Sequence, residues 1–235
     1  MLTAAEAEAA AVLAGMGSPG GTQCEPSRIG PYVGCRLPGE PAVTVLAGGI
    51  GPAAAAAATA TALALSPGVD LVLNAGVAGG FAAAGVSVGD VVLATTSGFA
   101  DLGAESPGGF LPAAELGWPA AEFPASPELL AVVTDRLRRA GLTVHAGPVL
   151  TVSTVTGTAA AAARLSARSR PVAEAMEGAA VAGAAARFGR RFLELRTVSN
   201  LVGDRDRDAW DVAGALDTLR AAMAAARPAL LLESP

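Results

Sequence analysis

Short apolar runs alternate with longer Ala-rich segments along the 235 residues of the chain. Apolar runs bounded by Gly or Pro are typical of buried strands, and longer Ala-rich segments are typical of helices. The pattern predicts strands at residues 43–47, 69–73, 90–95, 146–152 and 192–198. It predicts helices at residues 4–14, 53–65, 127–140, 158–165, 172–188 and 212–226. This alternation predicts a three-layer α/β fold with a mainly parallel central sheet flanked by helices.

The chain is expected to form a single domain, residues 1–235, because it contains no internal repeat and no long linker. Residues 97–123 form the longest irregular stretch and are rich in Gly and Pro. Such a stretch is typical of a lid or of a loop at an oligomer contact. Only three residues precede the first predicted helix, so either the chain starts further upstream or its first strand is very short.

Apolar residues make up 52% of the chain but aromatic residues only 4%, so the core is built from Ala, Val and Leu. No apolar run reaches the roughly 18 residues of a membrane span, and residues 1–8 lack a basic leader. We therefore expect a soluble, cytoplasmic protein. The net charge of −5 and the pI near 4.9 argue against nucleic acids and anionic membranes as partners.

Metal chemistry is not expected. Cys24 and Cys35 match no metal-binding or redox spacing, and His145 is the single histidine. These three residues are interpreted as ordinary packing or surface residues, and the sequence predicts neither a metal nor another cofactor.

Glycines follow two of the predicted strands. Residues 48–52 (GGIGP) end one strand and start an Ala-rich helix, and residues 74–81 (NAGVAGGF) end the next strand. Glycines at such turns allow backbone N–H groups to approach an anion or a polar ligand. Each turn alone is also consistent with a plain tight turn. Two of them on neighbouring strands favour a shared cleft at the carboxyl edge of the sheet.

Two glutamates lie in the predicted helix at residues 172–188. Glu174 and Glu177 are three residues apart and would be near neighbours on a helix. Glu174 is interpreted as exposed in the first helical turn, where the helix dipole favours an acid. Glu177 lies closer to the buried part of the helix, and a buried carboxylate needs a partner. A carboxylate there is suited to accept two hydrogen bonds from a vicinal diol such as that of ribose.

At this point the chain resembles the nucleoside phosphorylase and nucleosidase family. The matching segments are residues 74–80 (NAGVAGG), 89–92 (GDVV), 175–180 (AMEGAA) and 196–200 (RTVSN), in the order of the family. Within it the chain most resembles the futalosine hydrolases of menaquinone biosynthesis, on residues 99–105, 150–157 and 199–206 with Trp210. The resemblance covers nearly the whole chain and implies the fold expected above.

The resemblance implies an N-glycosidase whose substrate is a purine nucleoside. Glu177 would bind the ribose hydroxyls, Met176 would pack on the sugar, and the main chain of Val155 would meet the purine edge. Glu8 would activate water, with Glu6 as the alternative, although a solvated helix carboxylate is the competing interpretation of Glu8. The other residues that the resemblance assigns to the substrate are Gly51, Val77, Ala78, Gly79, Ser199, Asp206 and Trp210.

Asn200 occupies the position at which adenine-specific nucleosidases of the family carry Asp. The amide of Asn can donate to N7 and to a 6-oxo oxygen, so Asn200 favours a 6-oxopurine such as hypoxanthine. Asn cannot act as a general acid, so it would stabilise the departing base without protonating it. Asp204, Asp206 and solvent stay open as proton sources. Thr154 takes the place of the aromatic residue that stacks on the base, with Phe81 or Trp210 as substitutes.

The predicted reaction is hydrolysis of futalosine to hypoxanthine and dehypoxanthine futalosine. Hydrolysis is preferred over phosphorolysis because a candidate glutamate is present and the arginines form no compact cluster, although a neighbouring subunit could supply Arg28 and Arg36. The alternatives are a methylthioadenosine/S-adenosylhomocysteine type of nucleosidase, a purine nucleoside phosphorylase and a noncatalytic nucleoside-binding protein. The resemblance also implies a homo-oligomer, a dimer or larger.

Overall fold

The computed structural model describes residues 1–17, 24–39, 41–118 and 121–232. Its helices are α1 (Glu6–Met16), α2 (Pro52–Leu65), α3 (Pro127–Arg139), α4 (Ala159–Ser169), α5 (Gly178–Arg187) and α6 (Val212–Leu232), with short 3-10 helices at Ala82–Ala84 and Arg207–Ala209. Its strands are β1 (Leu2–Thr3), β2 (Glu25–Ile29), β3 (Tyr32–Leu37), β4 (Val43–Ala47), β5 (Leu71–Gly80), β6 (Val91–Phe99), β7 (Gly103–Ser106), β8 (Gly109–Pro112), β9 (Glu122–Pro124), β10 (Val144–Thr151), β11 (Ala173–Ala175) and β12 (Arg191–Leu201).

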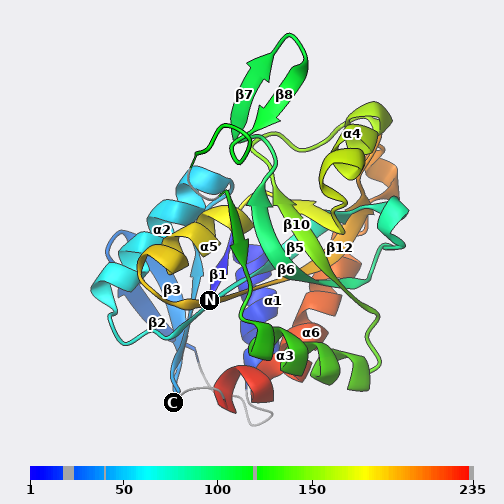
Figure 1. Cartoon of the computed structure of the whole chain (residues 1–235). Helices are drawn as coiled ribbons and strands as arrows, with labels where there is room; N and C mark the ends of the chain where they lie inside the picture. Colours follow the sequence, from blue (N-terminus) through cyan, green and yellow to red (C-terminus); the bar gives the residue numbers. More distant parts are fainter. Residues whose placement is uncertain (18–23, 40, 119–120, 233–235) are drawn as a thin grey trace.

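The elements form three layers, as expected for an α/β fold (Figure 1). One apolar cluster joins the sheet to α1, α3 and α6, and its buried members include Val12, Val133 and Met223 from these three helices. A second cluster joins the opposite face of the sheet to α2 and α5, largely through alanines. Small side chains permit this close approach of helices to the sheet, so the Ala-rich composition suits the layered packing.

The sheet is mixed rather than uniformly parallel. Its strand order is β11-β10-β6-β12-β5-β1-β4-β3-β2, with β9 paired to β6. β11 also pairs with β5, so the strands β5, β12, β6, β10 and β11 close into a ring. The pairs β1–β4, β5–β12 and β6–β10 are parallel, which places the ends of several strands at one edge.

The five predicted strands and the first, second, third, fourth and sixth predicted helices are confirmed, and all but the strand at residues 43–47 have shifted ends. β1 is two residues long, so the first strand is very short. The prediction of a helix over residues 172–188 was wrong at its start. Residues 173–175 form β11, and α5 begins only at Gly178. The ladder from β10 to β11, with Leu150 opposite Glu174, draws this segment into the sheet.

The stretch at residues 97–123 was predicted to be irregular, and this was wrong for much of it. β6 continues to Phe99, and β7 and β8 pair as an antiparallel hairpin that projects from the body of the molecule beside α4 (Figure 1). Arg168 of α4 packs over the Phe110 ring of this hairpin, 4.5 Å from the ring centroid. Residues 119 and 120 of the stretch lie outside the described residues.

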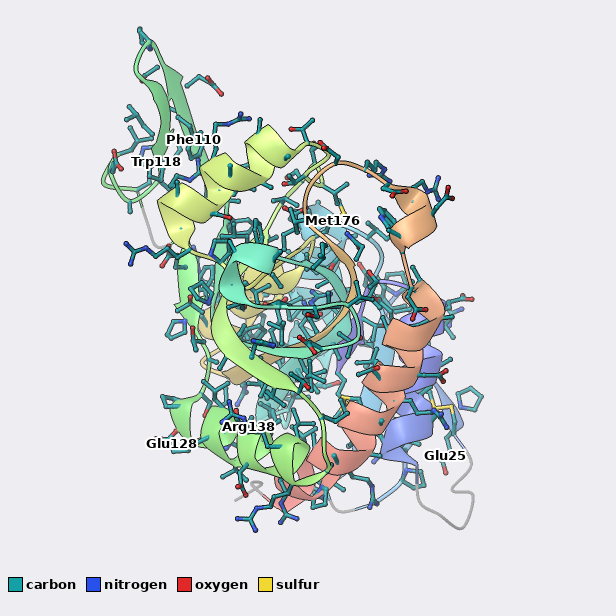
Figure 2. All side chains as sticks on the ribbon, turned by 90° about the vertical axis from the view of Figure 1, so that its right-hand side faces the viewer. Glu25, Phe110, Trp118, Glu128, Arg138 and Met176 are labelled. Carbon is teal, nitrogen blue, oxygen red and sulfur yellow. A yellow bond between two sulfur atoms is a disulfide. The ribbon has the colours of Figure 1, made fainter. Side chains whose placement is uncertain are left out.

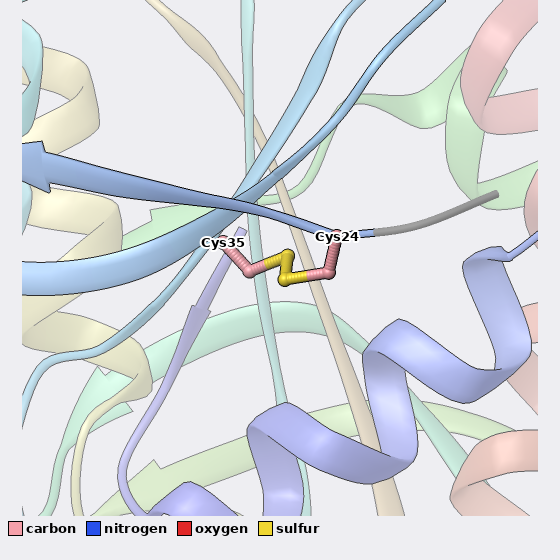
Figure 3. The surroundings of a disulfide bond; sticks show 2 residues. All are labelled: Cys24 and Cys35. Atoms are coloured by element: carbon pink, nitrogen blue, oxygen red, sulfur yellow. A yellow bond between two sulfur atoms is a disulfide. The ribbon is translucent and has the colours of Figure 1, made fainter.

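The interpretation of the cysteines as ordinary packing or surface residues was also wrong. A disulfide joins Cys24 to Cys35 (Figure 3). β2 and β3 form an antiparallel hairpin with Pro26 opposite Cys35, and this register brings the two cysteines together. Among the described residues, no helix is both long enough and apolar enough to cross a membrane.

Candidate active site

Most of the predicted site residues come from the ends of β5 and β12, from the turn before α2 and from the junction of β11 with α5. The others are Glu8 on α1, Val155 after β10, and Asp206 and Trp210 between β12 and α6. Figure 2 shows Met176 in the upper half of the view, whereas Glu128 and Arg138, which lie on α3, are near the bottom. Met176 is half-buried and packs against the small cluster of Ala100, Leu150 and Val152. The expectation that the site lies just beyond the strands agrees with this placement.

Arg196 is the centre of a buried group of charges. Its side chain is 1% exposed, and Nε lies 2.8 Å from Glu194 Oε1 while Nη2 lies 3.2 Å from Glu177 Oε2. Nη1 donates to the carbonyl oxygen of Val77 at 3.4 Å. Glu8 also interacts with the guanidinium electrostatically. We call Arg196, Glu8, Glu177 and Glu194 the arginine cluster.

Arg196 stays protonated. Burial by itself lowers the pKa of its guanidinium, but Glu194, Glu177 and Glu8 more than offset this effect, so the pKa lies above its ordinary value. A guanidinium is also the cation best suited to several simultaneous hydrogen bonds, because its donors form a planar fork. Arg196 therefore links the two glutamates predicted to be functional, Glu8 and Glu177, through one permanent positive charge.

Glu177 lies at the N-cap position of α5, not inside a helix as predicted. Its Oε1 accepts a hydrogen bond from the backbone N–H of Gly51 at 3.1 Å, and its side chain is buried. Gly51 has φ of +90°, a conformation that favours glycine, and this turns its N–H toward the carboxylate. The glycine turn after β4 thus binds an anion, and that anion is the protein's own carboxylate.

Glu8 is buried, with 6% of its surface exposed, so the interpretation as a solvated helix carboxylate is wrong. Its Oε2 accepts from the N–H groups of Ala4 and Ala5, and its Oε1 accepts from the N–H of Val77 at 2.9 Å. An ionised carboxylate offers about four acceptor positions, so roughly one stays available for water or a hydroxyl. Glu6, the alternative, is exposed to solvent.

Two glycines make the cluster possible. A Cβ at Gly76 would lie 2.8 Å from Arg196 Nη1 and would collide with the carboxylate of Glu8. A Cβ at Gly178 would collide with the carboxylate of Glu194. Both positions therefore require the absence of a side chain for the charged groups to meet.

Glu194 and Arg196 were missed as functional candidates by sequence reasoning. Glu194 is fully buried on β12 and accepts a hydrogen bond from the Ser97 hydroxyl as well as pairing with Arg196. The available signal was the position of two charged residues, two apart, inside the predicted strand at residues 192–198. Charged side chains inside a buried strand need a partner of opposite charge. An acid and a base two residues apart, as Glu194 and Arg196 are, lie on the same face of a strand and therefore indicate an ion pair inside the protein.

Asn200 lies at the end of β12 with its amide held by the residue before it. The Ser199 hydroxyl donates to Asn200 Oδ1 at 2.9 Å and also approaches the carbonyl oxygen of Ala78 at 3.3 Å. Asn200 Nδ2 donates to the carbonyl of Leu201 at 3.2 Å. A shift in register between Val198 and Asn200 leaves Ser199 without a partner opposite it on β5. With Oδ1 accepting from a hydroxyl and one N–H of Nδ2 donating to Leu201, one N–H of the amide is left without a described partner.

Glu174, interpreted from sequence as an exposed residue, is 4% exposed on β11. Thr156 donates to it from both its backbone N–H and its hydroxyl. Thr156 follows Val155, which is exposed at 37% and therefore accessible to a ligand. The residues predicted to meet the purine thus lie beside a buried carboxylate that was not predicted.

Asp204, Asp206 and Trp210 lie on a largely exposed segment, residues 204–210, which we call the charged loop. Asp204 accepts from the N–H of Ala159 at 2.9 Å, and Asp206 accepts from the N–H of Asp208 at 3.1 Å. The Trp210 ring lies 5.2 Å and 5.8 Å from the guanidinium carbons of Arg205 and Arg207. The hydrogen bonds of Asp204 and Asp206 and the ring contacts of Trp210 are thus made with other residues of the chain. Phe81, the other candidate for stacking on the base, is 2% exposed.

A cavity of about 590 Å³ lies at the opposite end of the strands and contains none of the predicted site residues. Its lining includes Arg28, Arg36, Val43, Asp70 and Leu71, which lie on β2 and β3 and near the starts of β4 and β5. Arg28 and Arg36 were considered as phosphate ligands supplied by a neighbouring subunit. Within one chain they line this cavity, and no described hydrogen bond or ion pair joins them to the arginine cluster.

The three-layer fold agrees with the family comparison. The family model described as the phosphorylase superfamily matches residues 1–234, so the chain belongs to the phosphorylase superfamily.

More particular relatives are two futalosine hydrolases. The protein from Acidothermus cellulolyticus is 51% identical over 156 residues, which are 66% of this chain and 63% of the relative. The protein from Streptomyces coelicolor is 47% identical over 163 residues, which are 68% of this chain and 66% of the relative. The matches thus span slightly under two thirds of the length of these curated relatives.

Solved structures show the same fold. The futalosine hydrolase of Helicobacter pylori superposes with a TM-score of 0.82 at 21% identity and covers 96% of this chain and 94% of its own. The methylthioadenosine/S-adenosylhomocysteine nucleosidase of Helicobacter pylori, solved with butyl-thio-DADMe-Immucillin-A, also gives 0.82 at 21% identity, with 97% and 95% covered. The corresponding nucleosidase of Neisseria meningitidis gives 0.81 at 24% identity, with 98% and 97% covered.

Proposed function

We propose that this protein hydrolyses the N-glycosidic bond of futalosine and releases hypoxanthine, as a step of menaquinone biosynthesis carried out by a homo-oligomer. The proposal is supported by the identity of 47–51% to two futalosine hydrolases over about two thirds of the chain. It is also supported by the two site groups described above, one rich in carboxylates and one carrying an amide.

The orientation of the Asn200 amide is the observation that carries the proposal. Its Oδ1 accepts from the Ser199 hydroxyl and one N–H of Nδ2 donates to the carbonyl of Leu201, so the second N–H of Nδ2 remains to face a base. A 6-oxopurine presents two acceptors on one edge, N7 and the 6-oxo oxygen, and both suit an amide N–H donor. A 6-aminopurine carries an N–H donor at position 6, which cannot form a hydrogen bond with the N–H donor Nδ2.

The proposed reaction passes through a sugar with oxocarbenium character, and the purine leaves with the bonding electrons. Glu177 accepts hydrogen bonds from the ribose hydroxyls and keeps the sugar in place. Asn200 stabilises the negative charge that develops on the base. Glu8 orients the water that attacks the anomeric carbon and takes its proton.

Arg196 gives this division of roles a physical basis. One guanidinium pairs with Glu177 and attracts Glu8, so it holds both carboxylates in position in the same site. A carboxylate at Glu177 is a hydrogen-bond acceptor for a diol, and a carboxylate at Glu8 is able to take a proton from water.

The test is release of free base by the purified protein from futalosine, inosine and methylthioadenosine, each with and without phosphate. The expected result is release of hypoxanthine from futalosine without phosphate and little reaction of the other two. Strict dependence on phosphate would replace hydrolysis with phosphorolysis. A preference for methylthioadenosine would assign the protein to the other nucleosidase activity, and no release from any substrate would indicate a binding protein.

The ribose role of Glu177 has its own test. Glu177→Gln keeps the size of the side chain but removes the charge, and we expect kcat/KM to fall about 100-fold because hydrogen bonds to a charged group are worth about 1.5–3 kcal/mol each. Glu122→Gln is the matched control, since Glu122 is an exposed carboxylate on β9. Turnover of the Glu177 variant close to that of the control would refute the assignment.

A further inference from the structure

The cavity of about 590 Å³ at the starts of the strands has no role in the proposed reaction. Its volume is within the usual range of small-molecule sites, about 300–1,000 Å³. The described residues that line it come mainly from β2, β3, β4, β5, α2 and the end of α6, and they include no member of the arginine cluster. Asn200 and Met176 do not belong to this lining either. The cavity is therefore separate from the candidate active site.

The floor of the cavity is apolar. Leu46 of β4, Leu63 of α2 and Val72 of β5 line it and belong to the second apolar cluster, and each is at most 6% exposed. Leu230 of α6 also lines the cavity and is likewise buried. These side chains are suited to cover the hydrocarbon part of a ligand, because contact with them removes apolar surface from water.

The mouth of the cavity is polar. Arg36 of β3 lies opposite Thr44 of β4, and Ser27 of β2 lies opposite Gly34, two residues before Arg36. Cross-strand neighbours and residues two apart share a face of a sheet, so Arg36, Thr44 and Ser27 present one guanidinium and two hydroxyls on the same side. All three line the cavity, and Arg36 is exposed to solvent. The cavity thus combines hydrogen-bonding groups at its mouth with an apolar floor.

Arg36 carries a charge that no described residue of the chain neutralises. Its guanidinium makes no hydrogen bond or ion pair with the described residues, although Glu25 lies opposite it on β2. Arg28 also lines the cavity without such a partner, and Asp70 is the single acid among the described lining residues. The lining is thus more positive than the chain as a whole, whose net charge is −5. A guanidinium in this state is a ready donor to a carboxylate, because its N–H groups form a planar fork.

The disulfide between Cys24 and Cys35 supports this wall of the cavity (Figure 3). It closes a ring of the chain that contains Ser27 and Arg28, and Arg36 directly follows Cys35. A wall that is fixed before a ligand arrives loses less conformational freedom on binding. The hairpin of β2 and β3 is therefore a preorganised support for the polar mouth.

We propose that the cavity is a second ligand site, which binds a small organic carboxylate with its apolar part against Leu63 and Val72 and its carboxylate on Arg36. The apolar floor would leave a fully polar anion such as inorganic phosphate without partners over much of its surface, so a carboxylate attached to hydrocarbon fits better. The inference goes beyond the proposed function, since no residue of the proposed reaction takes part in this site.

The test is calorimetric titration of the purified protein with 4-phenylbutyrate, which carries a carboxylate on an apolar body. We expect one site per chain with a Kd of about 1 mM or lower. 4-Phenylbutanol lacks the charge and butyrate lacks the aromatic ring, so each should bind at least about tenfold more weakly. Absence of saturable binding of 4-phenylbutyrate would overturn the inference, and so would equally tight binding of the alcohol.

The role of Arg36 is tested by Arg36→Gln, which should weaken the binding of 4-phenylbutyrate about tenfold because the charged contact is lost. Arg36 is exposed, so this variant should fold, and circular dichroism verifies it. Arg136→Gln is the matched control, since Arg136 is exposed on α3 and does not line the cavity. Equal affinities of the two variants for 4-phenylbutyrate would contradict the assignment of the carboxylate to Arg36.

Competition with hypoxanthine separates this site from the active site. Saturating hypoxanthine should leave the affinity for 4-phenylbutyrate unchanged. Displacement of 4-phenylbutyrate by hypoxanthine would place the probe in the base site and overturn the inference. The titration does not depend on turnover, so a failure of the protein to hydrolyse futalosine would overturn only the proposed function.

Discussion

Arg196, at the centre of the arginine cluster, lies only a few residues before the charged loop in the sequence, yet its charge is buried whereas the charges of the loop are exposed. Arg196 is 1% exposed and its charge is shared among Glu194, Glu177 and Glu8. In the loop at residues 204–210, Arg205, Asp206 and Arg207 are exposed to solvent. Charges close together in sequence are therefore a poor guide to a site, and burial decides which of them hold other groups in position.

The energetic reason is the dielectric environment. Exposed ion pairs are worth about 0–1 kcal/mol because water screens them. A buried pair contributes little net stability over an apolar replacement, but loss of one partner leaves the other charge unpaired in the interior. The arginine cluster is therefore sensitive to single substitutions, whereas the charged loop should tolerate them.

Arg196→Met should have the largest effect. It removes the positive charge and leaves Glu194 and Glu177 buried without their cation, so the free energy of unfolding should fall by about 3–5 kcal/mol. Urea denaturation followed by circular dichroism measures this change. The double variant Arg196→Met with Glu194→Leu should recover part of the loss, because it removes one stranded carboxylate. A decrease of less than about 1 kcal/mol in the free energy of unfolding of the single variant would mean that the buried glutamates do not depend on Arg196 for their stability.

Gly178→Ala should destabilise the protein by about 1–3 kcal/mol, the usual cost of overpacking. The new methyl group would meet the Glu194 carboxylate, which is held by Arg196 and Ser97 and cannot move without breaking those contacts. Gly203→Ala is the control, since a Cβ there would meet nothing within 4 Å. Equal thermal midpoints for the two variants would contradict the proposed crowding at residue 178.

Asn200→Asp tests the junction between the two regions. A protonated Asp can donate to N7 and accept from a 6-amino group, so the preference should shift toward 6-aminopurine nucleosides by about tenfold or more. The measurement is the ratio of kcat/KM for futalosine and its 6-amino analogue. Base selectivity equal to that of the parent protein would show that residue 200 does not read position 6.

Asp208→Asn should have the smallest effect. Asp208 is exposed in the charged loop, and loss of one exposed charge usually changes the free energy of unfolding by less than about 0.5 kcal/mol. Activity toward futalosine should also stay close to that of the parent protein. A large loss of activity with unchanged stability would show that the loop contributes charge to the site and would break the contrast with the arginine cluster.

The apolar pattern was sufficient to predict most of the fold. The spacing of short apolar runs and Ala-rich segments located five strands, and Val43–Ala47 has the predicted ends. The strands that were missed are short or rich in polar residues and Gly, such as β2 (Glu25–Ile29) and β11 (Ala173–Ala175). Such segments carry little periodic signal of their own and become strands because a neighbour pairs with them.

The missed strands explain the missed contacts. Without β2 and β3 there was no reason to bring Cys24 to Cys35, and without β11 there was no reason to bury Glu174. Glu8 could be nominated only through the family resemblance. Two of its three backbone donors, Ala4 and Ala5, are local, whereas the third, Val77, reaches it because α1 packs against β5.

The sequence by itself determined the layered α/β architecture, because hydrophobic periodicity and glycine turns are local properties of the chain. It also identified Asn200 and Glu177 as candidate site residues, because the motifs that contain them can be recognised in the sequence alone. Only the tertiary structure decided that Arg196 joins Glu8, Glu177 and Glu194, and that Glu174 flanks Gly79 opposite Asn200. These groupings depend on strand register and burial, and both are set by contacts between segments far apart in the sequence.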